Sequence, residues 1–171
     1  MANNNKVNLG NLIDNGKLYF SSEKNRNDLF SLIADGLYKE GYVKDSFLEA
    51  LKLREAQFPT GLISNLYNIA VPHVDSEHIN KNALITVILD TPIRFHRMDV
   101  NDEEIDVKVV FFLLIKDREH QAQAISNLTK LWQNDYIMES ILSVKNKEEY
   151  VNLIDAVCRE VVKPKFKEEL L

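Results

Sequence analysis

Five side chains of this 171-residue chain carry the groups best suited to act as nucleophiles or metal ligands near neutral pH. They are the four histidines, His73, His78, His96 and His120, and the single cysteine, Cys158. One cysteine cannot form a disulfide or a cysteine-based zinc site within the chain. Cys158 lies on an apolar helical stripe with nothing nearby to lower a thiol pKa, so we expect it to pack in the core. The histidines are the better candidates for chemistry.

His73 stands out among the histidines because Val71-Pro72-His73 places it directly after a short apolar segment. Proline fixes its own φ and holds the preceding residue extended, so the imidazole is presented from a stiff support. Ligands of open α/β sheets bind at strand ends. The alternative is an ordinary turn residue next to a proline. His73, Asp75 and His78 lack the spacing of a helix-face metal site, and we predict that the chain binds no metal.

Two further residues have types that suit an anion-binding site. Arg54 occupies a position where the apolar stripe of Phe47 and Leu51 would call for another apolar residue. It either serves a site or extends along the core and caps the helix C-terminus. His120 lies three residues after Asp117, a candidate N-cap, where free amides and the helix dipole favour an anion and disfavour imidazolium. The alternative for His120 is a surface position.

The hydrophobic pattern predicts the elements that must position these residues. A helix capped by Ser21-Ser22 ends near Lys39 at Gly41. Asp45 or Ser46 caps the next helix, and Ser46 would form a capping box with Glu49. The face expected to be buried in the first helix is Leu29, Phe30, Ile33, Ala34 and Leu37. Strands are expected at 18–20, 69–71, 83–89, 93–95 and 107–115, a solvated acidic loop at 99–106, and helices at 118–133, 135–143 and 147–162. The near-continuous apolarity of 107–115 indicates a central strand covered on both faces.

Composition excludes several classes of protein. The chain has 21 basic and 26 acidic residues, a net charge of −5, which argues against nucleic-acid binding. The longest apolar run is Val109 to Ile115, too short to span a membrane, and the N-terminus does not read as a secretory signal. The five glycines are too dispersed for a dinucleotide or P-loop motif, so we expect no cofactor. We expect a single cytoplasmic α/β domain over 11–162, with a polar N-terminal arm over 1–10 and a tail over 163–171; the arm leads to a turn at Asn15-Gly16.

Three segments together resemble a known family. Arg54-Glu55, Pro59-Thr60-Gly61 and Ala70-Val71-Pro72-His73 are similar to the signature of the type-2 EIIA domains of the bacterial phosphoenolpyruvate-dependent sugar phosphotransferase system (PTS). Each segment alone would be a weak signal, whereas the combination is specific. The resemblance covers roughly residues 10 to 160. It also includes Gly41-Tyr42-Val43, the acidic Asp102-Glu103-Glu104 and Glu119-His120.

The resemblance implies a fold and a role for each site residue. The family fold is a three-layer α/β/α sandwich around a mixed sheet of four to five strands. His73 matches the histidine that accepts a phosphoryl group from the phosphohistidine of the carrier HPr and passes it to a cysteine of EIIB. Arg54 matches an arginine beside that histidine, and His120 matches the second histidine of the mannitol and fructose branches. Thr60, Pro72 and His78 are possible pocket residues, with a turn role equally open for Thr60.

The partners follow from the same resemblance. The chain shows neither the EIIB phosphate loop nor an EIIC membrane span, so we expect it to work with a separate EIIB and a membrane EIIC, at the inner face of the membrane. The Arg54-to-Gly61 segment favours the galactitol type, although His120 departs from that branch. Two alternatives stay open: a regulatory phosphohistidine switch of the nitrogen-PTS kind, and a non-catalytic α/β binding module.

Overall fold

A five-stranded mixed sheet runs through the computed structural model, which describes residues 12, 13 and 15–162. The strands are β1 (Lys17–Ser21), β2 (Gly61–Leu62), β3 (Asn68–Ala70), β4 (Ala83–His96) and β5 (Glu104–Leu114). Their order across the sheet is β1-β4-β5-β3-β2. β1 runs parallel to β4 and β3 parallel to β5, whereas β4 with β5 and β2 with β3 are antiparallel. The expected mixed sheet is therefore confirmed, with β5 in the middle.

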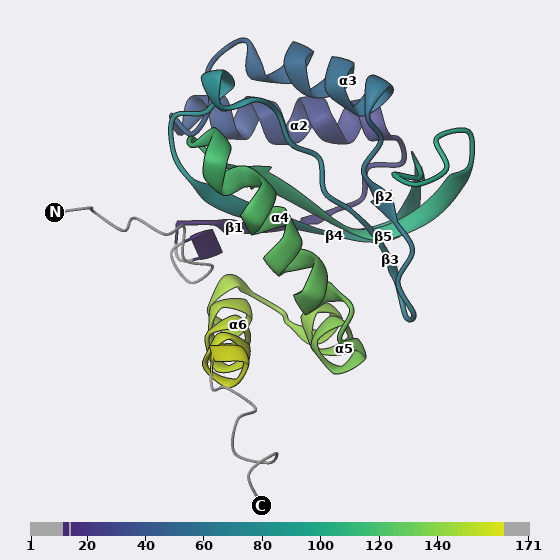
Figure 1. Cartoon of the computed structure of the whole chain (residues 1–171), viewed down its shortest axis with the longest axis vertical. Coiled ribbons are helices and arrows are strands. Elements are labelled where there is room, and N and C mark those ends of the chain that lie inside the picture. Colours follow the sequence, from purple (N-terminus) through teal and green to yellow (C-terminus); the bar gives the residue numbers. More distant parts are fainter. Residues whose placement is uncertain (1–11, 14, 163–171) are drawn as a thin grey trace, which may run out of the picture.

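Helices cover both faces of the sheet, which gives the three-layer α/β/α sandwich expected from the family resemblance (Figure 1). The pair α2 (Arg26–Lys39) and α3 (Phe47–Gln57) packs on one face. On the other face lie α4 (Arg118–Trp132), α5 (Asp135–Ser143) and α6 (Lys147–Val162). The last three helices begin and end within one residue of the predicted bounds. None of the helices in the described part of the chain is both long and apolar enough to cross a membrane.

The central strand β5 is buried on both faces, as its apolar run predicts. Phe111 packs with the α4–α6 layer and stacks on Trp132, with ring centroids 4.3 Å apart. Phe112 points to the α2–α3 layer and meets Phe30 edge-on at 5.6 Å. Because successive side chains of a strand point to opposite faces, one strand supplies both halves of the core. β5 is thus a rigid support for whatever lies beside it.

The first helix begins later than the sequence predicts. Ser21 is the last residue of β1, paired with Leu89, and therefore cannot cap the helix. Asn25 is the N-cap instead, and its side chain accepts a hydrogen bond of 2.9 Å from the Asp28 backbone N–H. The predicted buried face of α2 is confirmed in full. The predicted end is confirmed as well, because Gly41 adopts a left-handed φ of 77° just past the helix.

Two other expectations about the elements are wrong in detail, and one strand was not predicted. The segments 83–89 and 93–95 form one strand, β4, with a register irregularity between Ile88 and Ile93. The acidic loop is shorter than 99–106 because Glu104–Asp106 already pair with β4 as the start of β5. The two-residue strand β2 was not anticipated. Gly61 in β2 lies so close to β4 that a Cβ would come within 2.5 Å of the His96 carbonyl oxygen, so only glycine fits there.

The N-terminal expectations fall partly outside the described residues. The arm over 1–10, the tail over 163–171 and the side chain of Cys158 lie there. The prediction that the polar segment simply continues to the turn at Asn15-Gly16 is wrong, because Leu12 and Ile13 are helical and buried in the core with the α4–α6 layer. Both are apolar, and burying them removes their surface from water.

Candidate functional site

The backbone around His73 is held in the sheet beyond the end of β3. The Leu113 N–H of β5 donates to the Pro72 carbonyl at 3.1 Å, and His73 forms a parallel bridge with Leu113. Val71, Pro72 and His73 are all buried, His73 with 8% of its surface exposed. The stiff presentation predicted from the Pro-His pair is therefore reinforced by β5. The parallel strands β3 and β5 end at the same edge of the sheet, which brings His73 and the start of α4 to that edge.

One hydrogen bond decides which ring nitrogen of His73 carries the proton. Nδ1 lies 2.7 Å from the Val71 carbonyl oxygen, which can only accept, so Nδ1 carries the proton. Nε2 then keeps its lone pair. Burial lowers the pKa of His73 and is the largest effect. The Val71 carbonyl opposes it, the Arg54 charge lowers the pKa further, and Asp75 has the smallest, raising effect. The ring is therefore neutral at pH 7, with Nε2 as a nucleophile.

Arg54 faces that nitrogen from the last turn of α3. Its Nη2 lies 3.5 Å from His73 Nε2, and its Nη1 lies 3.3 Å from Asp75 Oδ1. The guanidinium also packs over the Phe58 ring, 5.6 Å from the centroid. The side chain of Arg54 therefore contacts both His73 and Asp75. A permanent positive charge beside a nucleophilic imidazole suits an incoming anion.

A cavity of about 310 Å³ opens beside Arg54, between α3 and the segment that follows His73. His78 lines it, with Nδ1 2.8 Å from Ser46 Oγ and Nε2 3.3 Å from Glu77 Oε1. Ser46 is the residue before α3, as predicted, but it makes no capping hydrogen bond, so the proposed capping box is wrong. Its hydroxyl reaches the His78 ring instead.

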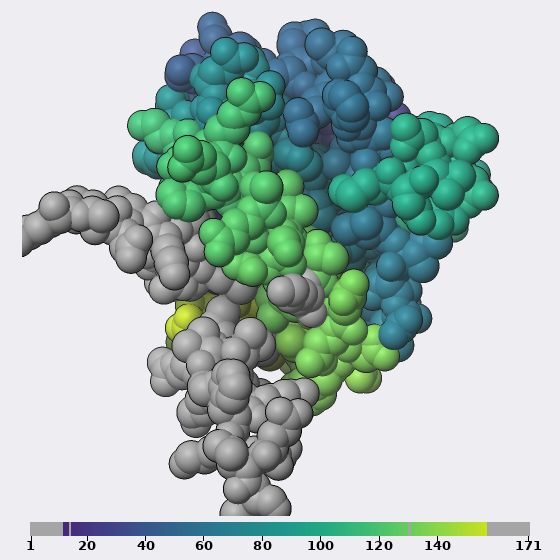
Figure 2. Space-filling view, viewed as in Figure 1, coloured from purple at the N-terminus to yellow at the C-terminus, as the bar shows by residue number. Residues whose placement is uncertain are grey.

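On the face shown in Figure 2, the α3 segment in blue and the first turns of α4 in green lie on the same side of the molecule.

Thr60 donates hydrogen bonds to Glu55, a residue of the Arg54-Glu55 motif to which we assigned no role from the sequence. Glu55 is 3% exposed and accepts three hydrogen bonds from Thr60, 2.9 Å from the backbone N–H and 2.9 and 3.2 Å from the hydroxyl. Burial raises the pKa of Glu55 to about 7, although the Thr60 hydrogen bonds and the Arg26 charge oppose the rise. Nothing in the spacing distinguishes Glu55 from a surface glutamate, because its burial comes from the chain folding back at Pro59.

His120 lies at the start of α4, close to the same sheet edge. Asp117 is the N-cap, as predicted, and its Oδ2 lies 2.9 Å from His120 Nδ1. The next residue, Gln121, donates through Nε2 to the Val74 carbonyl at 2.8 Å, which ties α4 to the segment carrying His73. Within the described ranges no hydrogen bond or ion pair joins His120 to His73. His120 thus flanks the segment rather than binding the ring.

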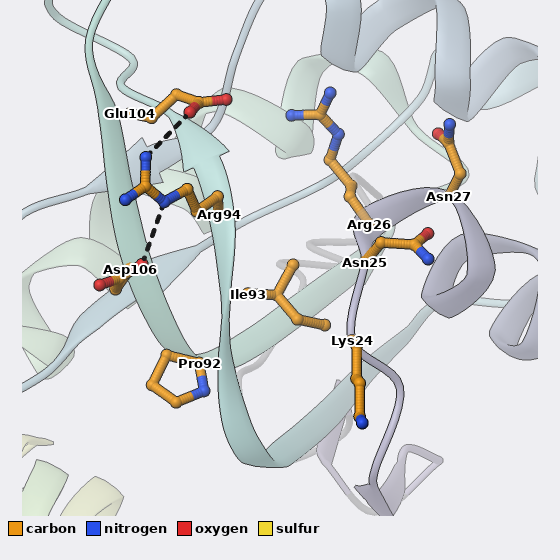
Figure 3. Close-up of a pocket in the computed structure, with 9 residues that line it drawn as sticks. All are labelled: Lys24, Asn25, Arg26, Asn27, Pro92, Ile93, Arg94, Glu104 and Asp106. Atoms are coloured by element: carbon orange, nitrogen blue, oxygen red, sulfur yellow. Dashed lines mark hydrogen bonds and ion pairs between the residues drawn. The ribbon is translucent and has the colours of Figure 1, made fainter.

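Two other features carry no comparable chemistry. His96 lies in β4 with Nε2 3.4 Å from Glu104. We expected a solvated histidine beside the acidic loop, but the residue is half-buried and its Nδ1 is buried with no hydrogen-bond partner among the described residues. A hollow of about 450 Å³ between the start of α2 and the β4–β5 pair contains Arg94, which reaches Glu104 at 3.4 Å and Asp106 at 3.6 Å (Figure 3). None of the residues that line this hollow is a histidine or cysteine nucleophile. The candidate site is therefore the group formed by His73, Arg54 and Asp75.

Comparison with known proteins identifies the family of the chain. Residues 12–157 match the family described as phosphoenolpyruvate-dependent sugar phosphotransferase system, EIIA 2. The galactitol-specific EIIA component of Escherichia coli strain K12 is 26% identical over 119 residues, which cover 70% of this chain and 79% of that protein.

Solved structures show the same fold. The complex of enzyme IIAMTL and phosphorylated enzyme IIBMTL from Escherichia coli matches with a TM-score of 0.66 at 20% identity, covering 82% of this chain and 94% of that one. Nitrogen regulatory protein IIA-Ntr from Neisseria meningitidis matches with a TM-score of 0.67 at 20% identity, covering 85% and 97%.

Proposed function

Because the chain belongs to the EIIA 2 family of the phosphoenolpyruvate-dependent sugar phosphotransferase system, we propose that Nε2 of His73 is its phosphoryl acceptor. Members of this family are phosphotransferases that carry phosphohistidine. The observation that carries the proposal is the geometry of one ring: Nδ1 is held at 2.7 Å by the Val71 carbonyl, and Nε2 faces the Arg54 guanidinium at 3.5 Å. A fixed tautomer with its lone pair toward a cation suits attack on a phosphoryl group.

The transfer balances without a separate base. The Nε2 lone pair attacks the phosphorus of a donor phosphohistidine, the donor N–P bond breaks, and its electron pair returns to the donor nitrogen. The Nδ1 proton of His73 stays on the ring and donates to the Val71 carbonyl. The phosphorylated His73 ring is therefore positively charged, and the donor ring, which carried both a proton and the phosphoryl group, becomes neutral. Burial keeps the pKa of His73 low, which preserves the neutral nucleophile before the transfer. Arg54 stabilises the charge on the phosphoryl oxygens.

The group then leaves toward a second protein. A cysteine thiolate of a separate EIIB attacks the same phosphorus, the N–P bond breaks, and its electron pair returns to Nε2. EIIA domains pass phosphate to EIIB, and the EIIA–EIIB complex from Escherichia coli has the fold described here. We assign the donor role to the phosphohistidine of HPr. Any position of the chain at the membrane would follow from binding EIIB and its membrane partner EIIC.

We propose supporting roles for the neighbouring residues. Pro72 fixes the backbone below the ring through the Leu113 hydrogen bond, and Thr60 shapes the pocket floor by holding Glu55 rather than touching phosphate. His120 contributes an N–H at the start of α4, where the helix dipole favours an anion. His78 forms part of the cavity wall beside Arg54.

Labelling with radioactive phosphoenolpyruvate, EI and HPr tests the assignment. Wild type is expected to take up about one acid-labile phosphate per chain, and His73→Ala none. His96→Ala is the matched control, because it removes a histidine outside the site. Spectra of the phosphorylated chain with ¹⁵N-labelled histidine are expected to assign the phosphate to Nε2. Label on His73→Ala, or phosphate on Nδ1, would contradict the mechanism.

The sugar branch is a finer proposal. We favour the galactitol type, supported by the Arg54-to-Gly61 segment and by the relative at 26% identity. Phosphoryl transfer from the labelled chain to purified galactitol-specific and mannitol-specific EIIB proteins tests it. We expect faster transfer to the galactitol-specific EIIB. Equal rates, or a preference for the mannitol-specific EIIB, would reject the branch and leave the His73 assignment intact.

A further inference from the structure

Asp75 occupies a position that normally serves to cap a helix but directs its carboxylate elsewhere. It precedes η1, a 3-10 turn over Ser76–His78, as the N-cap residue. An N-cap aspartate usually accepts a hydrogen bond from a backbone N–H of the first turn. Here no side-chain cap bond forms, and Oδ1 lies 3.3 Å from Arg54 Nη1. The carboxylate is therefore available to hold the guanidinium.

The three nitrogens of Arg54 have different surroundings. Nη1 binds Asp75, Nη2 faces His73 Nε2, and Nε is buried with no hydrogen-bond partner among the described residues. Nε and Nη2 form one edge of the planar guanidinium, and because Nε is buried, Nη2 is the nitrogen of that edge that can meet a phosphoryl oxygen. Asp75 takes the nitrogen that does not belong to this edge. The carboxylate thereby fixes the rotation of the fork without occupying the edge next to His73.

We propose that Asp75 is a positioning residue for phosphoryl transfer, because it holds Arg54 Nη1 and so keeps Nη2 beside His73 Nε2, where the phosphoryl group arrives. The proposal rests on the function proposed above. Arg54 has a long side chain with about a third of its surface exposed, and without a holding contact it can adopt many rotamers. Phosphoryl transfer depends mainly on alignment, and a misplacement of about 1 Å reduces the rate by about 100-fold.

The negative charge of Asp75 by itself slows transfer, because it repels the phosphoryl group, but this effect is smaller than the gain from holding Arg54. A carboxylate near the site repels the phosphoryl oxygens, so removing it would favour transfer on electrostatic grounds alone. Asp75 is more than half exposed and already paired with Arg54, so water, salt and the guanidinium screen this repulsion. The net effect of removing the carboxylate is therefore slower transfer.

Single-turnover transfer from phosphorylated HPr to the full chain tests the proposal. Asp75→Ala is expected to slow transfer by about 10-fold. Glu49→Ala is the matched control: it removes an exposed carboxylate from the helix that carries Arg54 but outside the cavity, and its rate is expected to stay within about twofold of wild type. Thermal unfolding checks that each variant is folded. Asp75→Asn keeps the size of the side chain but weakens its hold on a guanidinium, and provides the same comparison if the alanine variant unfolds.

A double-mutant cycle separates positioning from a structural role. If Asp75 acts through Arg54, then Asp75→Ala in an Arg54→Ala background produces no further slowing. An equal slowing in both backgrounds would overturn the proposal, as would a rate for Asp75→Ala that equals or exceeds that of Glu49→Ala. Failure of the proposed function looks different, because wild type would then accept no phosphate on His73 at all.

Discussion

The ionisation of Glu55 makes the stability of this chain depend on pH in a way that one substitution can isolate. Burial raises the pKa of Glu55 from 4.5 to about 7, so the folded chain keeps a proton that the unfolded chain releases. Between pH 4.5 and pH 7 the unfolded state binds fewer protons than the folded state. The contribution of Glu55 to the free energy of unfolding is therefore largest below pH 4.5. It falls as the pH rises through 7. Glu55→Gln removes this titration and keeps the acceptor oxygen for the Thr60 N–H.

The magnitude follows from the two pKa values. The difference between 4.5 and about 7 corresponds to about 3.4 kcal/mol in total, because one pKa unit is worth about 1.36 kcal/mol. About 2.5 kcal/mol of this is expected between pH 5 and pH 8. The free energy of unfolding of Glu55→Gln, relative to wild type, should therefore rise by about 2.5 kcal/mol across that range. All groups common to both proteins cancel in the difference.

Urea unfolding followed by circular dichroism at pH 5, 6, 7 and 8 measures the effect. Glu49→Gln provides the baseline, because it removes an exposed carboxylate from the same helix. A wild-type-to-Glu55→Gln difference that stays constant within about 0.5 kcal/mol would refute the reasoning, since Glu55 would then titrate alike in both states. A difference that falls with rising pH would mean that hydrogen bonding to the carboxylate outweighs burial.

Other predictions concern the site and one turn. Arg54→Ala is expected to slow phosphoryl transfer to His73 about 100-fold in rapid-quench assays, with thermal unfolding unchanged; an unfolded variant would indicate that Arg54 is structural. The NMR titration midpoint of His73 is expected below 6.5 and to rise in Arg54→Ala, because burial and the Arg54 charge both lower its pKa; a wild-type midpoint above 6.5 would contradict this. Gly41→Ala is expected to reduce the free energy of unfolding by about 1 kcal/mol in urea, because φ is 77° there, and an unchanged value would contradict the strain.

Much of the fold could be predicted because it depends on local patterns. The bounds of α4, α5 and α6 follow from apolar residues at helical spacing, and the buried run of β5 from uninterrupted apolar residues. The start of α2 could not be predicted, because Ser21 and Asn25 are both good caps. Pairing of Ser21 with Leu89 in the sheet decides between them. β2 was missed for the same reason, since its two residues become a strand only by pairing with β3 and through a bridge from Gly61 to Arg97.

The sequence by itself identified His73 and Arg54 as a pair, because their residue types and the motifs around them match a family. Only the tertiary structure decided what each atom does. The Val71 carbonyl selects the His73 tautomer, Asp75 sets the rotation of Arg54, and burial raises the pKa of Glu55. Ring orientation, hydrogen-bond direction and desolvation all depend on groups brought together from distant parts of the chain. Hydrophobic patterning records which residues are buried, and not the partners that their polar atoms meet.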